Sequence, residues 1–259
     1  MVPEILPRLR LESATAYVEP FVGGGAVFLA VRAAGFEGPV ILNDANPRVI
    51  AAWRAVQADP EGVIAGFRHH AARDSGVYYY GLRKQPPVGD TLLAAWFLYM
   101  NKAGFNGLYR VNAKGEFNVP YGDGKPPTLN EEAVWSAHRA LACVAIRCGD
   151  FAGIACPPRA ACYLDPPYLP LNATSSFTGY TRGGFGPGDQ LRLATWARAQ
   201  ADAGARVVLS NAGNADALTA FESRADRVTP IHASRVMSCK GAGRQPVREY
   251  LFEFQGGTT

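Results

Sequence analysis

The sequence contains no apolar run that approaches the ~20 residues of a membrane-spanning helix. Its first residues, MVPEILPRLRLE, lack the pattern of a signal peptide. Neither the five cysteines nor the four histidines follow a metal-ligand spacing, and no Cys-x-x-Cys pair occurs. These absences argue against a membrane protein, a secreted protein and a zinc protein. We therefore expect a cytoplasmic protein, a monomer in solution with no metal site, encoded by a bacterium, plasmid or phage.

The cysteines also give no sign of a disulfide framework. Their number is odd, and four of them lie in or beside apolar runs such as LACVAIRC and AACYL. Reduced Cys is among the most frequently buried residue types. We predict buried, reduced thiols at the four clustered positions, Cys143, Cys148, Cys156 and Cys162.

An excess of one charge is nearly absent as well. The 26 Lys and Arg against 22 Asp and Glu leave a net charge of +4, which is compatible with a nucleic-acid partner and equally with an ordinary solvated surface. The 48% hydrophobic content excludes a disordered chain. A length of 259 residues allows one large domain, or a core with one sizeable insertion.

The first clear unit is a strand, a glycine-rich turn, a helix and a second strand. We predict a strand at Tyr17–Val18, the turn at Gly23–Gly25, a helix over Ala26–Ala34 and a strand at Pro39–Leu42, with Asp44 just beyond. An acidic residue about 20 positions after the glycines is typical of a nucleotide or nucleoside site. The segment FVGGG is not GxGxxG, which disfavours a dinucleotide. A purely structural glycine turn explains these residues equally well at this point.

The middle of the chain differs from the first unit in its composition and residue pattern. It carries helical stretches at Arg54–His70 and Thr91–Asn101, interrupted by Pro and Gly at Pro86–Gly89 and Asp123–Pro127, with many aromatic and amide residues. We interpret residues 54–139 as an inserted, mainly helical domain. Residues 1–53 and 140–259 would then form the main domain.

After the insertion, strands alternate with helices again. The predicted strands are Ala142–Cys148, Ala160–Leu164, Arg206–Ser210, Val228–Val236 and Val247–Phe254, the last two joined through SCKGAGRQP, and the predicted helices are Gln190–Ala203 and Ala215–Ser223. This alternation predicts an α/β fold with an open, mostly parallel sheet covered on both faces. Ligands of such sheets bind at the carboxyl ends of the strands. The glycine turn, Asp44, Asp150 and the segment DPPY follow strands, so we expect them at one edge.

The segment Asp165-Pro166-Pro167-Tyr168 is the motif that points most specifically to a chemical function. Two prolines fix an extended turn and remove two amide donors, which leaves bare carbonyls beside a carboxylate and an aromatic ring. An exocyclic amine of a base needs two acceptors for its N–H groups and a ring on which to stack. Asp-Pro-Pro also serves as a structural turn, and that alternative stays open for the motif taken alone.

Several longer segments resemble one family, the Dam-type DNA adenine N6-methyltransferases. The resemblance lies in VEPFVGGGAVFL, ILNDAN, FLYMNKAGFNGLYRVNAKGEFNVPYG and YLDPPYLPLNATSSFTGY, and it extends from about residue 2 to residue 252. It implies a Rossmann-like methyltransferase sheet with an inserted DNA-recognition domain, S-adenosyl-L-methionine as cofactor and double-stranded DNA as partner. It also implies a direct transfer to a flipped-out adenine, without a covalent nucleophile, in GATC-like sites.

The resemblance further implies roles for individual residues. The cofactor-binding positions are Glu19, Pro20, Phe21, Gly23, Gly25, Asp44, Asp150, Phe151 and Asp165; Asp44 would hold the ribose, and Asp150 with Phe151 the adenine. The catalytic positions are Asp165, Pro166, Pro167 and Tyr168. The DNA-binding positions are Phe105, Asn106, Leu108, Arg110, Asn118 and Pro120. Phe105 would wedge into the base stack, Asn106 would touch phosphate, and Arg110 would read a guanine, which is the commonest specific contact in the major groove.

One departure from the family pattern keeps other functions open. Family members carry a Gly-Gly-Lys turn before their first helix, and this sequence contains no Gly-Gly-Lys. The chain could begin further upstream, could act without the turn, or could be a non-catalytic DNA-binding remnant. A methyltransferase acting on RNA adenine or on a protein amide is a further alternative, because the DPPY segment demands only a planar amine.

Overall fold

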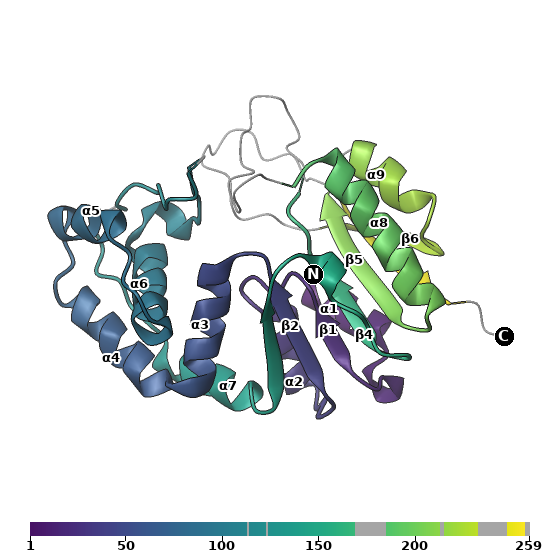
Figure 1. Cartoon of the computed structure of the whole chain (residues 1–259), viewed down its shortest axis with the longest axis horizontal. Helices are drawn as coiled ribbons and strands as arrows, with labels where there is room; N and C mark the ends of the chain where they lie inside the picture. Colours follow the sequence, from purple (N-terminus) through teal and green to yellow (C-terminus); the bar gives the residue numbers. More distant parts are fainter. Residues whose placement is uncertain (113, 123, 169–184, 213–214, 233–247, 257–259) are drawn as a thin grey trace. The chain divides into compact units, whose positions relative to one another are not determined.

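The computed structural model describes residues 1–112, 114–122, 124–168, 185–212, 215–232 and 248–256 of the chain. Within them, seven strands form one sheet in the order β3-β2-β1-β4-β5-β7-β6 (Figure 1). The strands are β1 (Tyr17–Glu19), β2 (Val40–Asp44), β3 (Val144–Cys148), β4 (Ala161–Leu164), β5 (Arg206–Ala212), β6 (Arg227–His232) and β7 (Arg248–Gln255).

The pairing explains where a site can lie. Strand β1 is parallel to β2 and β4, and β4 is parallel to β5. Strand β7 runs antiparallel to both β5 and β6. The carboxyl ends of β1, β4 and β5 therefore meet at one edge, because parallel strands end on the same side of a sheet. The predicted mixed α/β fold with a mostly parallel sheet is confirmed.

Helices occupy most of the connections. They are α1 (Val2–Leu9), α2 (Ala26–Ala33), α3 (Pro47–Ala58), α4 (Pro60–Ala71), α5 (Gly76–Lys84), α6 (Asp90–Ala103), α7 (Glu131–Ala140), α8 (Pro187–Asp202) and α9 (Ala215–Glu222), with single 3-10 turns η1 (Leu11–Ser13), η2 (Phe105–Gly107) and η3 (Phe151–Gly153). Across the described ranges, no helix has both the length and the apolar character to cross a membrane.

Contacts divide the chain into two compact units. The first contains Met1–Asn43 and the described residues from Asp150 onward, and the second contains Asp44–Gly149. The sequence-based division after residue 53 and before residue 140 differs from this one. The reason is that α3 packs against α6, α7 and β3, so its contacts lie within the second unit. Assigning catalysis to one unit and DNA recognition to the other remains a proposal.

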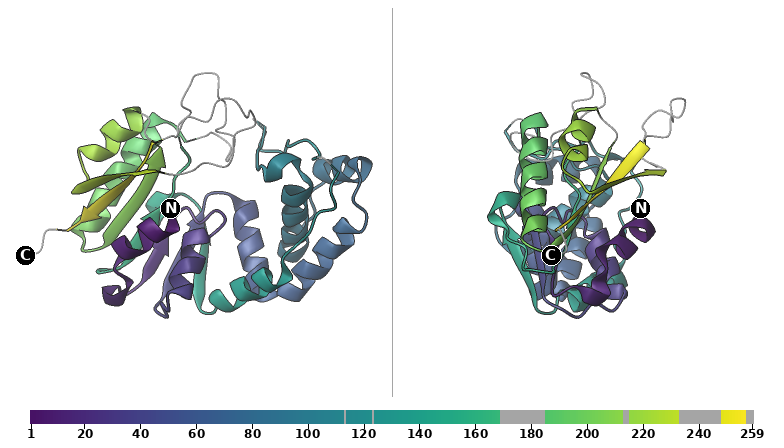
Figure 2. Two further views of the ribbon diagram at one scale, coloured as in Figure 1. Left: turned by 180° about the vertical axis from the view of Figure 1, so that it is seen from behind. Right: turned by 90° about the vertical axis from the view of Figure 1, so that its right-hand side faces the viewer.

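The core of the first unit lies on the sheet. Leu193 of α8, Val207 and Leu209 of β5, Phe221 of α9 and Phe252 of β7 are fully buried in one cluster. In the side view of Figure 2, α8 (green) and α1 (purple) lie on opposite faces of this sheet. Cover on both faces explains why strand β4 has no charged residue and why all four of its residues, Ala161–Leu164, are buried.

The second unit has an aromatic core of its own. Trp96, Tyr99 and Met100 of α6 pack with Phe67 and Tyr79, and all five side chains are nearly inaccessible. Tyr and Trp are buried where their polar atoms find partners. The Trp96 Nε1–H donates to the Leu82 carbonyl over 3.0 Å, and the Tyr99 hydroxyl donates to the Asp74 carboxylate over 2.6 Å.

Two sequence-based predictions need correction. Residues 54–70 do not form one helix, because α3 ends and α4 begins at Asp59 and Pro60. Asp59 leaves the helical region (φ −148°, ψ 67°) and its carboxylate accepts the Gly62 N–H over 2.9 Å, while Pro60 occupies the first helical position.

The predicted burial of all four clustered thiols is wrong for Cys143 and Cys148, which are exposed, and right for Cys156 and Cys162. Cys148 lies on β3, an edge strand with mostly uncovered residues, and Cys143 has a positive φ of 58° in the turn before that strand. The predicted strand over Val228–Val236 begins within β6. Its residues beyond His232, the segment SCKGAGRQP and Cys239 lie outside the described residues.

Candidate active site

The glycine turn links β1 to α2 and is fixed by backbone hydrogen bonds. The Val22 N–H donates to Asn43 O over 2.9 Å, and the Gly25 N–H donates to Val22 O over 2.7 Å. Gly23 and Gly25 have positive φ values of 45° and 67°, which side chains disfavour. Gly24 has no such requirement, and a Cβ there would meet nothing within 4 Å. The turn therefore has a conformation that needs glycine, and it leaves open space beside Gly24.

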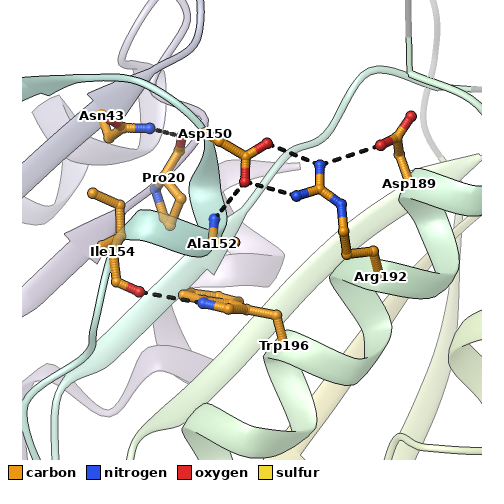
Figure 3. A network of polar contacts seen from close by, with 8 residues as sticks. All are labelled: Pro20, Asn43, Asp150, Ala152, Ile154, Asp189, Arg192 and Trp196. Carbon is orange, nitrogen blue, oxygen red and sulfur yellow. Dashed lines mark hydrogen bonds and ion pairs between the residues drawn. The ribbon is translucent and has the colours of Figure 1, made fainter.

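The base of this turn is polar and buried. Glu19 is only 2% exposed, and its Oε2 accepts the Tyr17 hydroxyl over 2.6 Å. Burial, and next the Glu19 carboxylate, raise the pKa of Tyr17 well above its ordinary value, so this hydroxyl stays protonated and donates. The Asn43 Nδ2 donates to Pro20 O over 3.0 Å and ties the turn to β2 (Figure 3).

Asp44 is the last residue of β2 and belongs by its contacts to the second unit. Its side chain is 4% exposed, and its Oδ1 accepts the Asn46 N–H over 2.8 Å. Asn46 in turn caps α3 by accepting the Arg48 N–H over 3.0 Å. The carboxylate is thus held at a fixed position immediately before a helix.

The segment after residue 149 brings a carboxylate and a ring together. Asp150 precedes η3, and its Oδ1 accepts the Ala152 N–H over 2.9 Å. The neighbouring Phe151 is 3% exposed, and its ring lies 5.5 Å from that of Phe21, centroid to centroid. The predicted cofactor residues Phe21 and Phe151 are therefore in contact with each other.

The DPPY segment follows the buried strand β4, as predicted. Asp165 is exposed, and its Oδ1 accepts two hydroxyl hydrogen bonds, from Ser210 over 3.0 Å and from Tyr168 over 3.2 Å. The Ser210 hydroxyl also meets the Tyr163 hydroxyl, 2.9 Å away. Ser210 has one hydrogen, and a carboxylate can only accept, so Tyr163 must be the donor in that pair. Burial raises the pKa of Tyr163, which keeps that hydroxyl protonated. A chain of two hydroxyls therefore orients the carboxylate.

A second buried pair holds the prolines. Gln190 and Asn211 are both fully buried, and the Gln190 Nε2 donates to Pro167 O over 3.1 Å while its Oε1 accepts the Asn211 Nδ2 over 3.1 Å. The Pro167 carbonyl is thus occupied by the protein itself, which gives Pro167 a structural contact.

Sequence reasoning missed Ser210, Asn211 and Gln190. One signal existed: the apolar run of β5 ends in the polar pair Ser-Asn at its carboxyl end. Gln190, the third of these residues, lies in α8, and nothing in the sequence of that helix marks it as buried. In the described part of the chain, no group of three or more His, Cys, Asp or Glu side chains could hold a metal ion.

The predicted DNA-binding residues lie in a loop of the second unit. Two antiparallel bridges, Gly104 with Tyr121 and Val111 with Phe117, close this loop. Four of the predicted residues are exposed and two are half-buried; the exposed ones are Phe105, Asn106, Arg110 and Pro120, and the half-buried ones are Leu108 and Asn118. Leu108 also packs against the aromatic core, so part of its side chain has a structural role.

Arg110 is held by Asn118. The Arg110 Nε donates to Asn118 Oδ1 over 2.8 Å, and Nη2 donates to Asn118 O over 3.2 Å. Behind them, the Arg83 Nη1 and the Tyr79 hydroxyl donate to Val119 O over 2.9 and 3.1 Å. The loop therefore presents an oriented guanidinium on a backbone fixed from the core.

A mostly parallel sheet in which β1 leads into a glycine turn and β4 into Asp-Pro-Pro-Tyr defines a methyltransferase that acts on a planar amino group. The family model for the D12 class N6 adenine-specific DNA methyltransferases matches residues 1–236. The chain belongs to this family, and it is an adenine-specific DNA methyltransferase, as the resemblance implied. Family membership also implies S-adenosylmethionine as methyl donor and DNA as substrate.

Individual relatives align with this chain over nearly its full length. The type II methyltransferase M.MjaIII of Methanocaldococcus jannaschii is 35% identical over 263 residues, which cover 94% of this chain and 90% of that protein. The DNA adenine methylase of Vibrio cholerae is 35% identical over 256 residues, covering 94% and 88%. The DNA N-6-adenine-methyltransferase of Escherichia phage P1 is 34% identical over 241 residues, covering 90% of this chain and 31% of that protein.

Proposed function

We propose that this chain methylates adenine N6 in double-stranded DNA at GATC-like sites, with Asp165 and Tyr168 holding the flipped-out base. The observation that carries the proposal is the Asp165 carboxylate, which two hydroxyls orient at the sheet edge where the glycine turn follows β1. Orientation matters because an amine is activated by acceptors placed on its N–H groups. A fixed carboxylate can do this without rearranging during the reaction.

The first unit contains residues suited to S-adenosylmethionine. Gly24 leaves room for close approach to the backbone, and Phe21 and Phe151 offer apolar rings. Glu19 places a buried carboxylate at the start of the turn, and Asp150 places another beside the rings. A cofactor with an adenine ring, hydroxyls and a positive charge matches this combination of rings and carboxylates. In the second unit, Asp44 supplies an acceptor for ribose hydroxyls.

The chain's own residues account for the activation of the target amine. The Asp165 carboxylate and the Pro166 carbonyl accept hydrogen bonds from the two N6–H groups. These hydrogen bonds favour a pyramidal nitrogen, whose lone pair is no longer delocalised into the ring. The Tyr168 ring stacks on the base. When bound, S-adenosylmethionine would supply a methyl group on a sulfonium: the N6–C bond would form as the C–S bond breaks, S-adenosylhomocysteine would leave as the thioether, and the methylated nitrogen would release one proton to water.

The loop of the second unit suits base flipping and guanine recognition. Phe105 is 42% exposed, and a ring of this size can fill the hole left by an extruded base. Arg110 has five N–H donors, and Asn118 takes two of them. Within the described residues, both hydrogens of Nη1 and one of Nη2 remain without an acceptor, and these form the edge that binds guanine O6 and N7 together. Asn118 thus supports recognition by orienting Arg110.

The test of this function is methyl transfer from tritiated S-adenosylmethionine to duplex DNA, tRNA and protein, followed by nucleoside analysis. We expect N6-methyladenine in duplex DNA, and sequencing should map it to GATC-like sites. Transfer to tRNA without transfer to DNA would instead support an RNA methyltransferase. DNA binding without any transfer would support a non-catalytic remnant.

Ser210→Ala should lower kcat by about tenfold and leave KM for DNA unchanged, because the hydroxyl acts through Asp165 rather than on DNA. The test is steady-state kinetics with DNA as the varied substrate. Ser210→Thr, which keeps the hydroxyl, should recover most of the lost kcat. The matched control is Ser223→Ala, which removes a hydroxyl bonded to the Thr219 carbonyl and should change neither constant. An unchanged kcat in Ser210→Ala would show that the contact does not position Asp165.

Asp44→Ala should weaken cofactor affinity about tenfold to a hundredfold, since a hydrogen bond to a charged group contributes about 1.5–3 kcal/mol. Sequence preference should stay the same, because this residue faces no base in the proposed role. Calorimetry with S-adenosylhomocysteine measures the effect. Asp59→Ala is the matched control: it also removes a carboxylate that accepts one backbone N–H at the start of a helix. Equal affinities of the two variants would contradict the ribose assignment.

A further inference from the structure

Arg192 of α8 makes an unusually complete set of contacts with the segment after residue 149. Its Nη1 and Nη2 donate to the two carboxylate oxygens of Asp150, each over 2.8 Å, and Nη2 also donates to Asp189 over 3.2 Å (Figure 3). The guanidinium carbon lies 4.5 Å from the centroid of the Phe151 ring. One side chain thus holds both residues that the proposed function assigns to the cofactor's adenine.

These contacts do not contribute much to stability as an ion pair. The side chains of Arg192 and Asp150 are 46% and 52% exposed. Pairs exposed to this extent contribute about 0–1 kcal/mol, because water screens both charges. What the pair supplies is geometry: a planar guanidinium that meets both oxygens of a carboxylate fixes its rotation, which a single-point contact cannot do.

The fixed rotation leaves a defined acceptor on Asp150. A carboxylate has about four acceptor positions, two on each oxygen. Within the described residues, Oδ1 accepts from Arg192 and from the Ala152 N–H, while Oδ2 accepts from Arg192 alone. The Arg192 hydrogen bond lowers the pKa of Asp150, which keeps both oxygens acceptors at neutral pH. One position on Oδ2 is therefore available for an outside N–H donor.

Helix α8 also holds the ring beside this acceptor. Trp196, one turn after Arg192, donates from Nε1 to Ile154 O over 3.2 Å (Figure 3). The Trp196 ring also lies 6.0 Å from the Phe151 ring, centroid to centroid. Phe151 is consequently fixed from the helix by Trp196 and by the guanidinium, and it contacts Phe21 as well. The flat ring and the single acceptor keep a constant relation to each other.

We propose that Arg192 is a positioning residue that makes the cofactor site selective for a 6-aminopurine: by fixing Asp150, it aims the remaining Oδ2 acceptor at the 6-amino group. This inference rests on the proposed function, in which Asp150 and Phe151 contact the cofactor's adenine. A 6-oxopurine presents an acceptor at that position and would face the carboxylate as a second acceptor. Sites built to hydrogen-bond a substrate N–H reject analogues that lack it far more strongly than apolar pockets do.

The experiment compares S-adenosylhomocysteine with its 6-oxo analogue, S-inosylhomocysteine, by calorimetry on the full chain. Wild type should bind the amino compound at least tenfold more tightly. In Arg192→Ala, Kd for the amino compound should rise about tenfold, and the preference should fall to about threefold or less. Arg192→Lys should behave like Arg192→Ala, because lysine cannot contact both oxygens of Asp150 in one plane.

The matched control is Arg198→Ala on the same helix. Arg198 pairs with Asp202 and Asp226, both over 2.9 Å, and its loss should affect melting temperature while leaving the preference at the wild-type ratio. A wild-type preference that persists in Arg192→Ala would overturn the role of Arg192. Equal binding of both compounds by wild type would also overturn it. Failure of wild type to bind S-adenosylhomocysteine at all would overturn the proposed function together with this inference.

Discussion

Asp165→Ala is expected to lower the rate of methyl transfer on the order of 10²–10³-fold or more, the range found when one oriented polar group is removed from an active site. The fold and the DNA affinity should change little, because the exposed carboxylate contributes nothing to the core. Single-turnover transfer from tritiated S-adenosylmethionine to duplex DNA measures the effect. Asp202→Ala, which removes an exposed carboxylate from α8, is the control and should keep wild-type turnover.

Asp165→Asn should be as inactive as Asp165→Ala, although it preserves size and shape. The Ser210 and Tyr168 hydroxyls donate to Oδ1, so they would hold the amide oxygen on their side. The NH2 group would then occupy the position of Oδ2 and would present donors to an amine that needs acceptors. A turnover above about a tenth of wild type in either variant would exclude Asp165 from the catalytic role. A loss of less than about tenfold is far smaller than the effect of removing a group that contacts the reacting atoms.

Trp96→Ala is expected to lower the free energy of unfolding by about 3–5 kcal/mol, the usual cost of truncating a large buried aromatic side chain. Trp96 is fully buried, lies 6.0 Å from the Phe117 ring, and has the Arg48 guanidinium 5.7 Å above its own ring. Its loss also removes one of two donors to the Leu82 carbonyl, which keeps the Gln85 N–H. For a chain of this size, the melting temperature should fall on the order of 10 °C.

Thermal and urea unfolding, followed by tryptophan fluorescence and circular dichroism, measure this change. Trp135→Ala is the matched control in the same unit, since Trp135 is 36% exposed and contacts His138 at the surface. It should cost less than about 1 kcal/mol, as surface substitutions usually do. Similar losses in the two variants would mean that the aromatic cluster does not determine the stability of the second unit.

The sequence predicted those parts of the site that local rules determine. A glycine turn after an apolar strand and Asp-Pro-Pro-Tyr after another are visible in order along the chain, and the sheet brings both to one edge as expected. The contacts that orient them come from distant residues: Ser210 is 45 positions from Asp165, and Arg192 is 42 positions from Asp150. No periodicity or motif relates residues so far apart, so these partners appeared only in three dimensions.

Errors in the helices and thiols have equally physical origins. The break between α3 and α4 was recognisable, because Asp followed by Pro is a strong signal for a helix start, but an apolar periodicity on both sides concealed it. The exposure of Cys148 depends on β3 being an edge strand, which is a property of sheet order. Apolar neighbours in sequence predict burial only when the strand is covered on both sides.

Within the described residues, the second unit is the stretch Asp44–Gly149, and the two ends of this stretch meet: the Gly149 N–H donates to Asp44 O over 3.1 Å. A stretch whose first and last residues are joined by a hydrogen bond can differ in length between relatives while the distance between its two ends stays the same. Under the proposed division of roles, recombination between relatives could therefore vary the DNA-reading loop while Asp165 and Tyr168 stay in place. Asp44 and Gly149 are therefore the positions at which we propose to join segments of different relatives in chimeric enzymes, to test whether target choice follows the second unit.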